Sequence, residues 1–293
     1  MVIKAPAKIN ITLRVLSKRA DGYHEISSLM RAVRLFDEVE IVAIERGGDV
    51  FTPPVISMRS NAEGLPDGPD NLAWRAADLM LGMYPGRFGQ IDIGLKKNIP
   101  VAAGMAGGSC DAAAALLYLS KELAPEAGIS DIAAYGAKLG MDVPFCVYAC
   151  AAANPGLGYE GTGIALAEGA GDILTPLARR EKAWVVLVKP MVSVPTKQIY
   201  ELYDEWKGGS EGSENDLEGP CREAWPVVAE SLRTLKNICA EECREEVKVQ
   251  LCGSGPTVFA YFEDPGKNHE AQRVYERAKG IFPDMFVCLT ETL

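Results

Sequence analysis

The stretch from residue 100 to residue 115 reads Pro100-Val-Ala-Ala-Gly-Met-Ala-Gly-Gly-Ser-Cys-Asp-Ala-Ala-Ala-Ala115. Residues 90–96 before it alternate apolar and polar side chains, which predicts a strand, and the Ala/Leu-rich residues 111–123 predict a buried helix. Glycines at positions 104, 107 and 108 allow a backbone to approach a bulky ligand closely. The amides and the dipole at the start of the following helix attract anions. The stretch therefore predicts a phosphate-binding loop; the alternative is a tight turn that packs a small-residue helix on a sheet.

The loop matches neither of two common nucleotide-binding patterns. No lysine follows its glycines, as G-x-x-x-x-G-K-[ST] requires, and the next helix begins with Asp111-Ala rather than opening a dinucleotide fold. Ser109 offers a hydroxyl to a phosphate oxygen or to a metal ion. The spacing alone thus indicates an anion site without identifying the anion.

Composition restricts the classes of partner. The chain has 293 residues, of which 48% are hydrophobic and 24% charged, so we expect about two soluble domains of roughly 150 residues each. A net charge of −10 without a Lys/Arg run argues against nucleic acid or a membrane surface as the main partner. The start MVIKAPAKIN lacks the apolar segment of a signal peptide, and no run approaches the ~18 apolar residues of a membrane helix. We expect a cytoplasmic protein.

The cysteines suggest no metal centre. Eight are scattered along the chain and none forms a C-x-x-C pair. Cys146/Cys150 and Cys239/Cys243 have an i,i+4 spacing that suits a metal on a helix. With only two histidines in the chain, buried reduced thiols are favoured over zinc.

Periodicity predicts strands and helices in mixed order. Strands are expected at residues 2–15, 39–43, 55–60, 90–96, 143–150, 184–188, 247–253 and 257–262. Helices are expected after the cap Asp70-Asn71, at 111–123, at 132–138 with Gly140 as a left-handed stop, and around 224–235 and 272–279. Residues 207–219 are expected to form a surface loop. Without a regular βαβ repeat, the fold class is α+β.

Four segments, in this order, resemble the galactokinase, homoserine kinase, mevalonate kinase and phosphomevalonate kinase (GHMP) superfamily. They are Ala5-Pro-Ala-Lys-Ile-Asn10 with Asp21-Gly-Tyr-His24, Gly104–Ala115, Leu139-Gly-Met-Asp-Val-Pro-Phe145, and Cys252-Gly-Ser-Gly-Pro-Thr-Val-Phe259. The second resembles the superfamily's phosphate loop, P-x-x-x-G-x-x-[GS]-S-S-A. The first three are similar to the 4-diphosphocytidyl-2-C-methyl-D-erythritol kinase branch. Each motif alone is modest, but their common order over residues 5–259 is highly specific.

The resemblance implies a fold and a reaction. The expected fold is a two-domain GHMP kinase, with a ribosomal-S5-like N-terminal domain over residues 1–165 and a ferredoxin-like C-terminal domain over residues 166–293. The expected reaction transfers the γ-phosphate of ATP, with Mg²⁺, to the C2 hydroxyl of cytidine diphosphate methylerythritol in the non-mevalonate isoprenoid pathway. The expected functional unit is a monomer or a homodimer.

Two residues receive catalytic roles from the resemblance. Asp142 would take the proton of the acceptor hydroxyl, a task that suits a carboxylate; a lone Asp at such a place is more often a helix cap or a turn residue. Lys8 would pair with Asp142 near the acceptor oxygen. The alternative for Lys8 is an edge-strand lysine with its amine in water.

The same resemblance assigns binding residues. The nucleotide would contact Asn71 on its adenine side, Lys97 at its phosphates, and the loop formed by Ala103, Gly104, Met105, Ala106, Gly107, Gly108 and Ser109, with Ser109 also on the metal. Alternatives are a helix cap for Asn71 and a solvated turn for Lys97. The acceptor would contact Asn10, the cytosine-binding Tyr23, His24 and Tyr200, and Gly253 and Ser254; a turn histidine, an ordinary tyrosine and a plain hairpin turn are the alternatives.

Two features depart from the family pattern. Cys110 stands where a second serine is usual, so Ser109 carries the hydroxyl contacts. Residues 151–161 look like an insertion that lengthens a hairpin or reshapes the cleft rim. Two rival functions remain: a sister kinase acting on homoserine or a mevalonate-type acid, and a non-catalytic sugar- or nucleotide-binding regulator.

Overall fold

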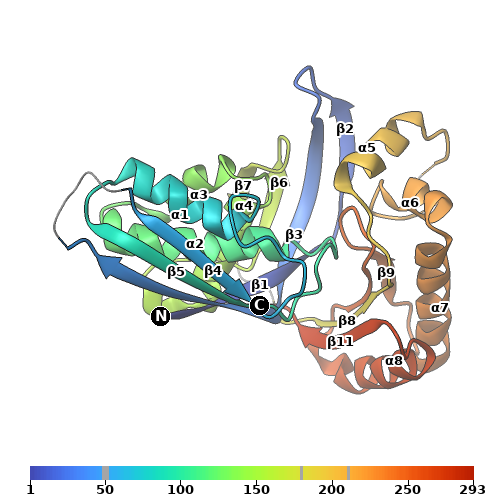
Figure 1. The fold of residues 1–293 in the computed structure, drawn as a ribbon. Coiled ribbons are helices and arrows are strands. Elements are labelled where there is room, and N and C mark those ends of the chain that lie inside the picture. The colour runs from blue at the N-terminus through green and yellow to red at the C-terminus, as the bar shows by residue number, and fades with distance from the viewer. Residues whose placement is uncertain (48–52, 179–180, 210–211) are drawn as a thin grey trace. The chain divides into compact units, whose positions relative to one another are not determined.

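The chain forms two compact units that are interleaved in sequence. The computed structural model describes residues 1–47, 53–178, 181–209 and 212–293 (Figure 1). The first unit contains residues 1–7, 35–99 and 106–163, and the second contains residues 8–34, 100–105 and 164–293. The expected domain boundary at residue 165 stays a prediction. Residues 8–34 and 100–105 group with the C-terminal part of the chain, a partition that a linear boundary does not express.

Strands β3 (His24–Glu45), β4 (Val55–Ser60) and β5 (Phe88–Lys96) build the sheet of the first unit. β5 pairs antiparallel with the C-terminal half of β3 and parallel with β4. The expected strand at residues 39–43 is thus one part of a 22-residue strand. The strands predicted at residues 55–60 and 90–96 are confirmed as β4 and β5. In β5 the alternating residues Ile91, Ile93 and Leu95 are buried.

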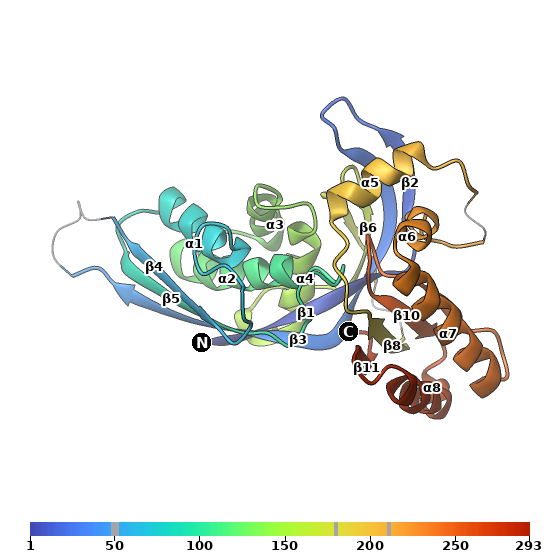
Figure 2. The ribbon, with the colours of Figure 1, turned by 45° about the vertical axis from the view of Figure 1, so that its right-hand side comes forward.

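Helices α1 (Leu72–Met83), α2 (Gly107–Leu123), α3 (Ile129–Ala137) and α4 (Val143–Ala153) lie on the same side of that sheet (Figures 1 and 2). α1 contacts β4 and β5, and α2 contacts α1, α3 and α4. α2 is therefore enclosed, which explains why its alanines from Ala112 to Ala115 are fully buried. It begins at Gly107 rather than at Asp111 as predicted.

The strand predicted at residues 143–150 is wrong: this segment is helix α4. A short apolar run has no period that separates a buried strand from a buried helix. Here Pro144 occupies the first helical turn, where its missing N–H costs nothing. Contacts with α2 and α3 then bury the helix on several faces.

Two local predictions in the first unit also need correction. Gly140 is not left-handed, since its φ is not positive, and α3 ends at Ala137 before it. Residues 151–161 form no hairpin; they contain the end of α4 and the short 3₁₀ helix η1 (Pro155–Leu157). Leu157 is buried, and Asn154 holds the backbone of Lys4 through hydrogen bonds of 3.0 and 2.8 Å. Ala151 and Leu157 thus belong to the core of this unit, while most of the segment is partly or fully exposed.

The second unit contains an antiparallel sheet in the order β11 (Phe286–Glu291), β8 (Trp184–Lys189), β10 (Val258–Phe262) and β9 (Lys248–Leu251). Helices α7 (Pro226–Glu242) and α8 (Asn268–Ile281) contact this sheet (Figure 2). Strands β8, β9 and β10 and helix α8 were predicted. The helix predicted around 224–235 is confirmed as α7, which begins at Pro226 and continues to Glu242; the preceding helix α6 (Glu218–Ala224) was not predicted. Strand β11 was not predicted.

The rest of the second unit surrounds the N-terminal half of β3. β2 (Arg14–Lys18) and β6 (Ile164–Glu168) pair with it, and β7 (Ile173–Pro176) pairs with β6. The strand predicted over residues 2–15 is therefore divided into β1 (Val2–Asn10) and β2. Helix α5 (Thr196–Glu205) completes the unit.

The surface loop predicted at residues 207–219 is only partly correct; its residues 210 and 211 lie outside the described residues. Asn215 and Leu217 are buried, and α6 already starts at Glu218. The side-chain amide of Asn215 donates to the carbonyls of Leu251 and Gly253 at 2.9 and 2.8 Å. The polar composition of this segment does not predict that Asn215 is buried, because it does not show which distant carbonyls accept hydrogen bonds from its amide.

Both units mix helices with sheets, so the predicted α+β class is confirmed. None of the helices in the described ranges is long and apolar enough to cross a membrane.

Candidate active site

The first turn of α2 presents backbone amides. The first helical bond runs from the amide of Cys110 to the carbonyl of Ala106 at 2.9 Å. The amides of Gly107, Gly108 and Ser109 therefore have no carbonyl partner within the helix. Ala106 precedes them in the left-handed region, with φ 57°, and directs the chain into the turn. Three consecutive amides and a helix dipole suit an anion, as the sequence predicted.

The preceding part of the loop belongs to the second unit, where Ala103 and Met105 are buried. Gly104 has φ 74°, and a Cβ built on it would lie 2.6 Å from the carbonyl oxygen of Gly255 and 2.7 Å from that of Cys252. Glycine is required here twice, for its backbone conformation and for the contact with two carbonyls.

We expect Gly104→Ala to lower the free energy of unfolding by at least about 2 kcal/mol, because it adds a left-handed side chain and a clash with backbone. Urea denaturation measures the change. Gly108→Ala is the matched control, since a Cβ there meets nothing within 4 Å and φ is not positive. Equal stabilities for the two variants would contradict the prediction.

Lys8 lies near the end of β1 in the second unit and is only 4% exposed. Its Nζ donates to Asn10 Oδ1 at 2.9 Å and to the carbonyl of Gly104 at 3.1 Å. The alternative of an edge-strand lysine with its amine in water is therefore wrong. A buried ammonium is costly unless its hydrogen bonds are made, so these neutral partners hold a cation in place.

Gly253 brings the C-terminal glycine motif to the same place. It has φ 55°, and a Cβ there would lie 3.0 Å from Asn10 Oδ1 and 3.1 Å from Lys8 Nζ. The next residue, Ser254, has its hydroxyl 3.2 Å from that of Thr196. The second unit thus gathers Lys8, Asn10, Gly104 and Gly253, which the sequence places up to 245 positions apart (253 minus 8).

Buried polar residues that the sequence analysis missed support this cluster. Asn10 Nδ2 donates to the hydroxyl of Ser28 at 2.8 Å, and Gln250 Nε2 donates to the carbonyls of Asn10 and Ile11 at 2.8 and 3.0 Å. Gln250 is a polar residue between the apolar residues Val249 and Leu251 of a strand, and this position could have marked it as a buried polar group. The sequence around Ser28 and Asn215 offers no such sign.

Asp142 precedes α4 in the first unit at the N-cap position, with φ −80° and ψ −18°. Its side chain makes no capping hydrogen bond, so the helix-cap alternative is wrong. The dipole of α4 favours a negative charge at this end. The turn-residue alternative and the catalytic role of Asp142 both stay predictions.

His24 and Tyr200 come together in the second unit. Their ring centroids are 4.8 Å apart with 23° between planes, and His24 Nε2 lies 2.7 Å from Asp204 Oδ1. Asp204 also accepts from Lys18 at 2.5 Å, and these hydrogen bonds, first that from Lys18, lower the pKa of Asp204. Tyr23 is 52% exposed. Asp204 was missed, because its partners Lys18 and His24 are distant in the sequence.

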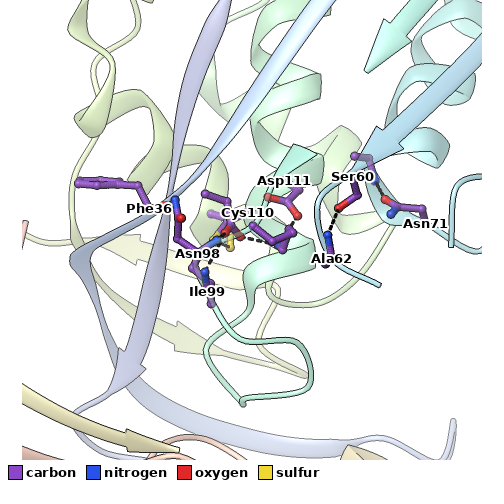
Figure 3. Close-up of polar contacts among 12 residues, drawn as sticks. Phe36, Ser60, Ala62, Asn71, Asn98, Ile99, Cys110 and Asp111 are labelled. Atoms are coloured by element: carbon purple, nitrogen blue, oxygen red, sulfur yellow. Dashed lines mark hydrogen bonds and ion pairs between the residues drawn. The ribbon is translucent and has the colours of Figure 1, made fainter. Parts of the chain in front are cut away.

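Lys97 and Asn71 have partners in the first unit. The side chain of Lys97 is 6% exposed and donates to Asp37 and, at 2.5 Å, to Asp111, so the solvated-turn alternative is wrong. Asn71 Oδ1 caps α1 by accepting from the amide of Ala73 at 2.9 Å (Figure 3). The cap alternative is thus confirmed for Asn71, while its adenine-side role stays a prediction.

The cysteines are free, and six of the eight are buried. Cys110 Sγ lies 2.7 Å from Cys146 Sγ between α2 and α4, so the thiol that replaces the usual serine faces the helix interface. Burial raises the pKa of Cys146 and of Cys150 well above the ordinary value. Among the described residues, no group of three or more His, Cys, Asp or Glu side chains is arranged to hold a metal.

Asp111 makes the stability depend on pH. Burial raises its pKa to about 7 from 3.8, against the lowering charge of Lys97. The neutral form is thus favoured in the folded state, and its contribution is full below about pH 4 and lost as the pH rises to about 7. We expect the Tm of Asp111→Asn minus that of the wild type to increase from pH 4 to 7 and then level. A difference constant across this range in thermal denaturation contradicts this assignment.

Residues 71–150 match the model of the GHMP kinases N terminal domain. A 4-diphosphocytidyl-2-C-methyl-D-erythritol kinase of Geobacter metallireducens is 36% identical over 277 residues, which cover 89% of each chain. The chain belongs to the 4-diphosphocytidyl-2-C-methyl-D-erythritol kinase family. A Clostridium perfringens protein of the same name is 36% identical, covering 100% of this chain and 98% of its own.

Solved structures agree with this membership. A crystal structure of 4-(cytidine 5'-diphospho)-2C-methyl-D-erythritol kinase superposes with a TM-score of 0.71 at 29% identity, covering 100% of this chain and 99% of the other. Homoserine kinase from Cytophaga hutchinsonii reaches 0.66 at 17% identity, covering 100% and 94%. The second likeness concerns the fold alone, which this family shares with other GHMP kinases.

Proposed function

We propose that this kinase transfers the γ-phosphoryl group of ATP to the C2 hydroxyl of 4-diphosphocytidyl-2-C-methyl-D-erythritol in the non-mevalonate isoprenoid pathway. The observation that carries the proposal is the buried cluster of Lys8, Asn10, Gly104 and Gly253 in a chain of this family. The cluster places a buried, hydrogen-bonded cation beside two left-handed glycines, Gly104 and Gly253. Such a cation is the kind of group that phosphoryl transfer needs near the reacting oxygens.

The nucleotide is assigned to the first turn of α2. The amides of Gly107, Gly108 and Ser109 bind its phosphates, with Ala103, Gly104, Met105 and Ala106 shaping the approach. Asn71 is assigned to the adenine side, in addition to its role as a cap. This site binds charge through backbone dipoles, which matters in a chain of net charge −10.

The acceptor is assigned to residues of the second unit. The cytosine ring contacts Tyr23, His24 and Tyr200, of which His24 and Tyr200 already stack. Asn10, Gly253 and Ser254 bind the polar part of the acceptor. Asp142 accepts the proton of the C2 hydroxyl as the new P–O bond forms, and Lys8 stabilises the negative charge on the oxygens.

The residues present fit Mg²⁺. This ion takes one or two protein oxygens, with nucleotide phosphates and water supplying the rest, and Ser109 offers a hydroxyl in the first turn of α2. When bound, Mg²⁺ would neutralise phosphate charge. The free cysteines suit a reducing compartment, so we place the reaction in the cytoplasm, with a monomer or homodimer as the functional unit.

A coupled ADP-release assay tests the function with the cytidyl acceptor, homoserine and mevalonate, each with ATP and Mg²⁺. Turnover is expected with the cytidyl acceptor alone, since a small aliphatic acid leaves the rings of His24 and Tyr200 without a base to contact. Turnover with either of the other compounds and none with the cytidyl acceptor would overturn the proposal. ADP release without a phosphorylated product would instead support the regulator.

A further inference from the structure

A buried charge cluster at the start of α2 has no part in the function proposed above. It consists of Lys97, just after β5, Asp37 on β3 and Asp111 on α2. Lys97 Nζ donates to both carboxylates, and both carboxylates are almost completely buried, at 0% and 3% side-chain exposure. Figure 3 shows Asp111 near the start of α2, in the neighbourhood of Asn98 and Ile99.

The cluster ties three segments of the first unit together. Asp37 Oδ1 accepts from the amides of Asn98 and Ile99 at 2.6 and 2.8 Å. The side-chain amide of Asn98 donates to the carbonyl of Phe36 at 2.8 Å (Figure 3). Asp37 is therefore fully engaged, holding the turn after β5 against β3, and Lys97 connects that turn to α2 through Asp111.

The ammonium of Lys97 lies directly against the proposed phosphate-binding turn. A Cβ built on Gly107 would lie 3.3 Å from Lys97 Nζ and 3.2 Å from Ile99 Cγ2. These two side chains occupy the space beside Gly107 into which a Cβ would project. The position of Lys97 is therefore coupled to that of the residue that provides the first of the three amides.

Charge within the cluster is unbalanced. One ammonium faces two carboxylates, and Asp111 Oδ1 is buried without a hydrogen-bond partner. Burial by itself would lower the pKa of Lys97, but the charges of Asp111 and Asp37 outweigh it and raise that pKa. The ammonium is held where it is by two strong partners, which a group that binds phosphate directly would have to give up.

We propose that Lys97, clamped by Asp37 and Asp111, is a positioning residue that holds the amides of Gly107, Gly108 and Ser109 in place for the nucleotide, rather than a direct ligand of its phosphates. This inference rests on the proposed nucleotide site. Backbone dipoles bind a charge well only when they are already oriented, and the clamp supplies that orientation from behind the turn.

The test compares Asp111→Asn, Lys97→Met and the double variant, with ADP affinity from calorimetry and the KM for ATP, at pH 8 where Asp111 is ionised. Positioning predicts that each single variant weakens ADP binding and raises the KM for ATP about tenfold. It also predicts that the double variant binds ADP no more weakly than the single variant with the lower ADP affinity, because each single change already breaks the same clamp. The acceptor KM stays unchanged.

Lys96→Met is the matched control. Lys96 is the preceding lysine, exposed and paired with Glu38 at 2.9 Å, so its replacement leaves ADP affinity and both KM values unchanged. A fall in ADP affinity equal to that of Lys97→Met would show that any loss of charge weakens the nucleotide, and would overturn the clamp.

A direct phosphate ligand behaves differently. Lys97→Met would then weaken ADP binding, while Asp111→Asn would leave it unchanged or strengthen it by releasing the ammonium; that pattern overturns the proposal. If Lys97→Met fails to fold, Asp111→Asn alone decides, since it keeps the shape of the side chain.

The two proposals fail separately. Wild-type protein that binds ADP without phosphorylating the cytidyl acceptor refutes the function and leaves the clamp standing. Normal turnover combined with unchanged ADP affinity in Asp111→Asn refutes the clamp and leaves the function standing. Wild-type protein that binds no ADP overturns both.

Discussion

Asp142→Asn is expected to lower kcat by about 10³-fold, since general-base catalysis contributes roughly 10²–10⁴-fold. An amide keeps the shape of the side chain but cannot accept the proton of the acceptor hydroxyl. The carboxylate of Asp142 makes no capping hydrogen bond with α4, so the variant does not remove a helix cap. ADP release with the cytidyl acceptor measures kcat, and thermal denaturation measures the stability of the variant.

Asp131→Asn provides the converse control in the neighbouring helix of the same unit. The Asp131 side chain accepts from the amide of Gly128 at 2.9 Å, in a capping arrangement at the start of α3. Its replacement is expected to cost about 0.5–1 kcal/mol of stability with no change in kcat. Turnover retained in Asp142→Asn at the wild-type rate would remove the general base from the mechanism.

Lys8→Met is expected to lower kcat by at least about 10²-fold, the loss seen when one charge-stabilising donor is removed from a reacting site. The variant keeps most of the buried stem, but Asn10 Oδ1 and the carbonyl of Gly104 lose a donor. Leaving such groups unpaired adds a stability cost of about 1–3 kcal/mol. Single-turnover kinetics and urea denaturation separate the two effects.

Lys4→Met is the control for Lys8, because Lys4 lies on the same strand with an exposed side chain. Lys8→Arg is not expected to restore activity. Gly253 lies so close to Lys8 that a Cβ on it would come within 3.1 Å of Nζ, which leaves no room for a guanidinium. Wild-type kcat in Lys8→Met would assign this lysine to folding alone.

Capping, periodicity and glycine patterns predicted the elements that are set by residues close together in the sequence. Asn71 caps α1 because its side chain reaches the amide of Ala73 within the same turn. Residues 55–60 form β4, in which more and less exposed side chains alternate over the first residues. The first turn of α2 was predicted as an anion site from its glycines. In each of these cases the sequence pattern that signals the element spans only a few residues, so it can be recognised from the order of residues along the chain.

Residues whose environment is distant could not be assigned in this way. Residues 143–150 are apolar in either a strand or a helix, and contacts with α2 and α3 decide for the helix. Lys97 was expected at the phosphates, and nothing in its neighbours reveals that Asp37, 60 positions away (97 minus 37), holds it. Asp204 and Asn215 were missed for the same reason, since the groups that they bind lie in distant parts of the chain.

The amino-acid sequence by itself determined the α+β class, the kinase family, the glycine loop and the identity of Lys8, Asp142 and His24 as candidates. Tertiary structure alone decided that Lys8 is buried, that the side chain of Asp142 makes no capping hydrogen bond, and that Lys97 is paired with Asp37 and Asp111. The physical reason is that periodicity and capping are short-range, whereas the burial of a charge depends on which distant carbonyls and carboxylates surround it.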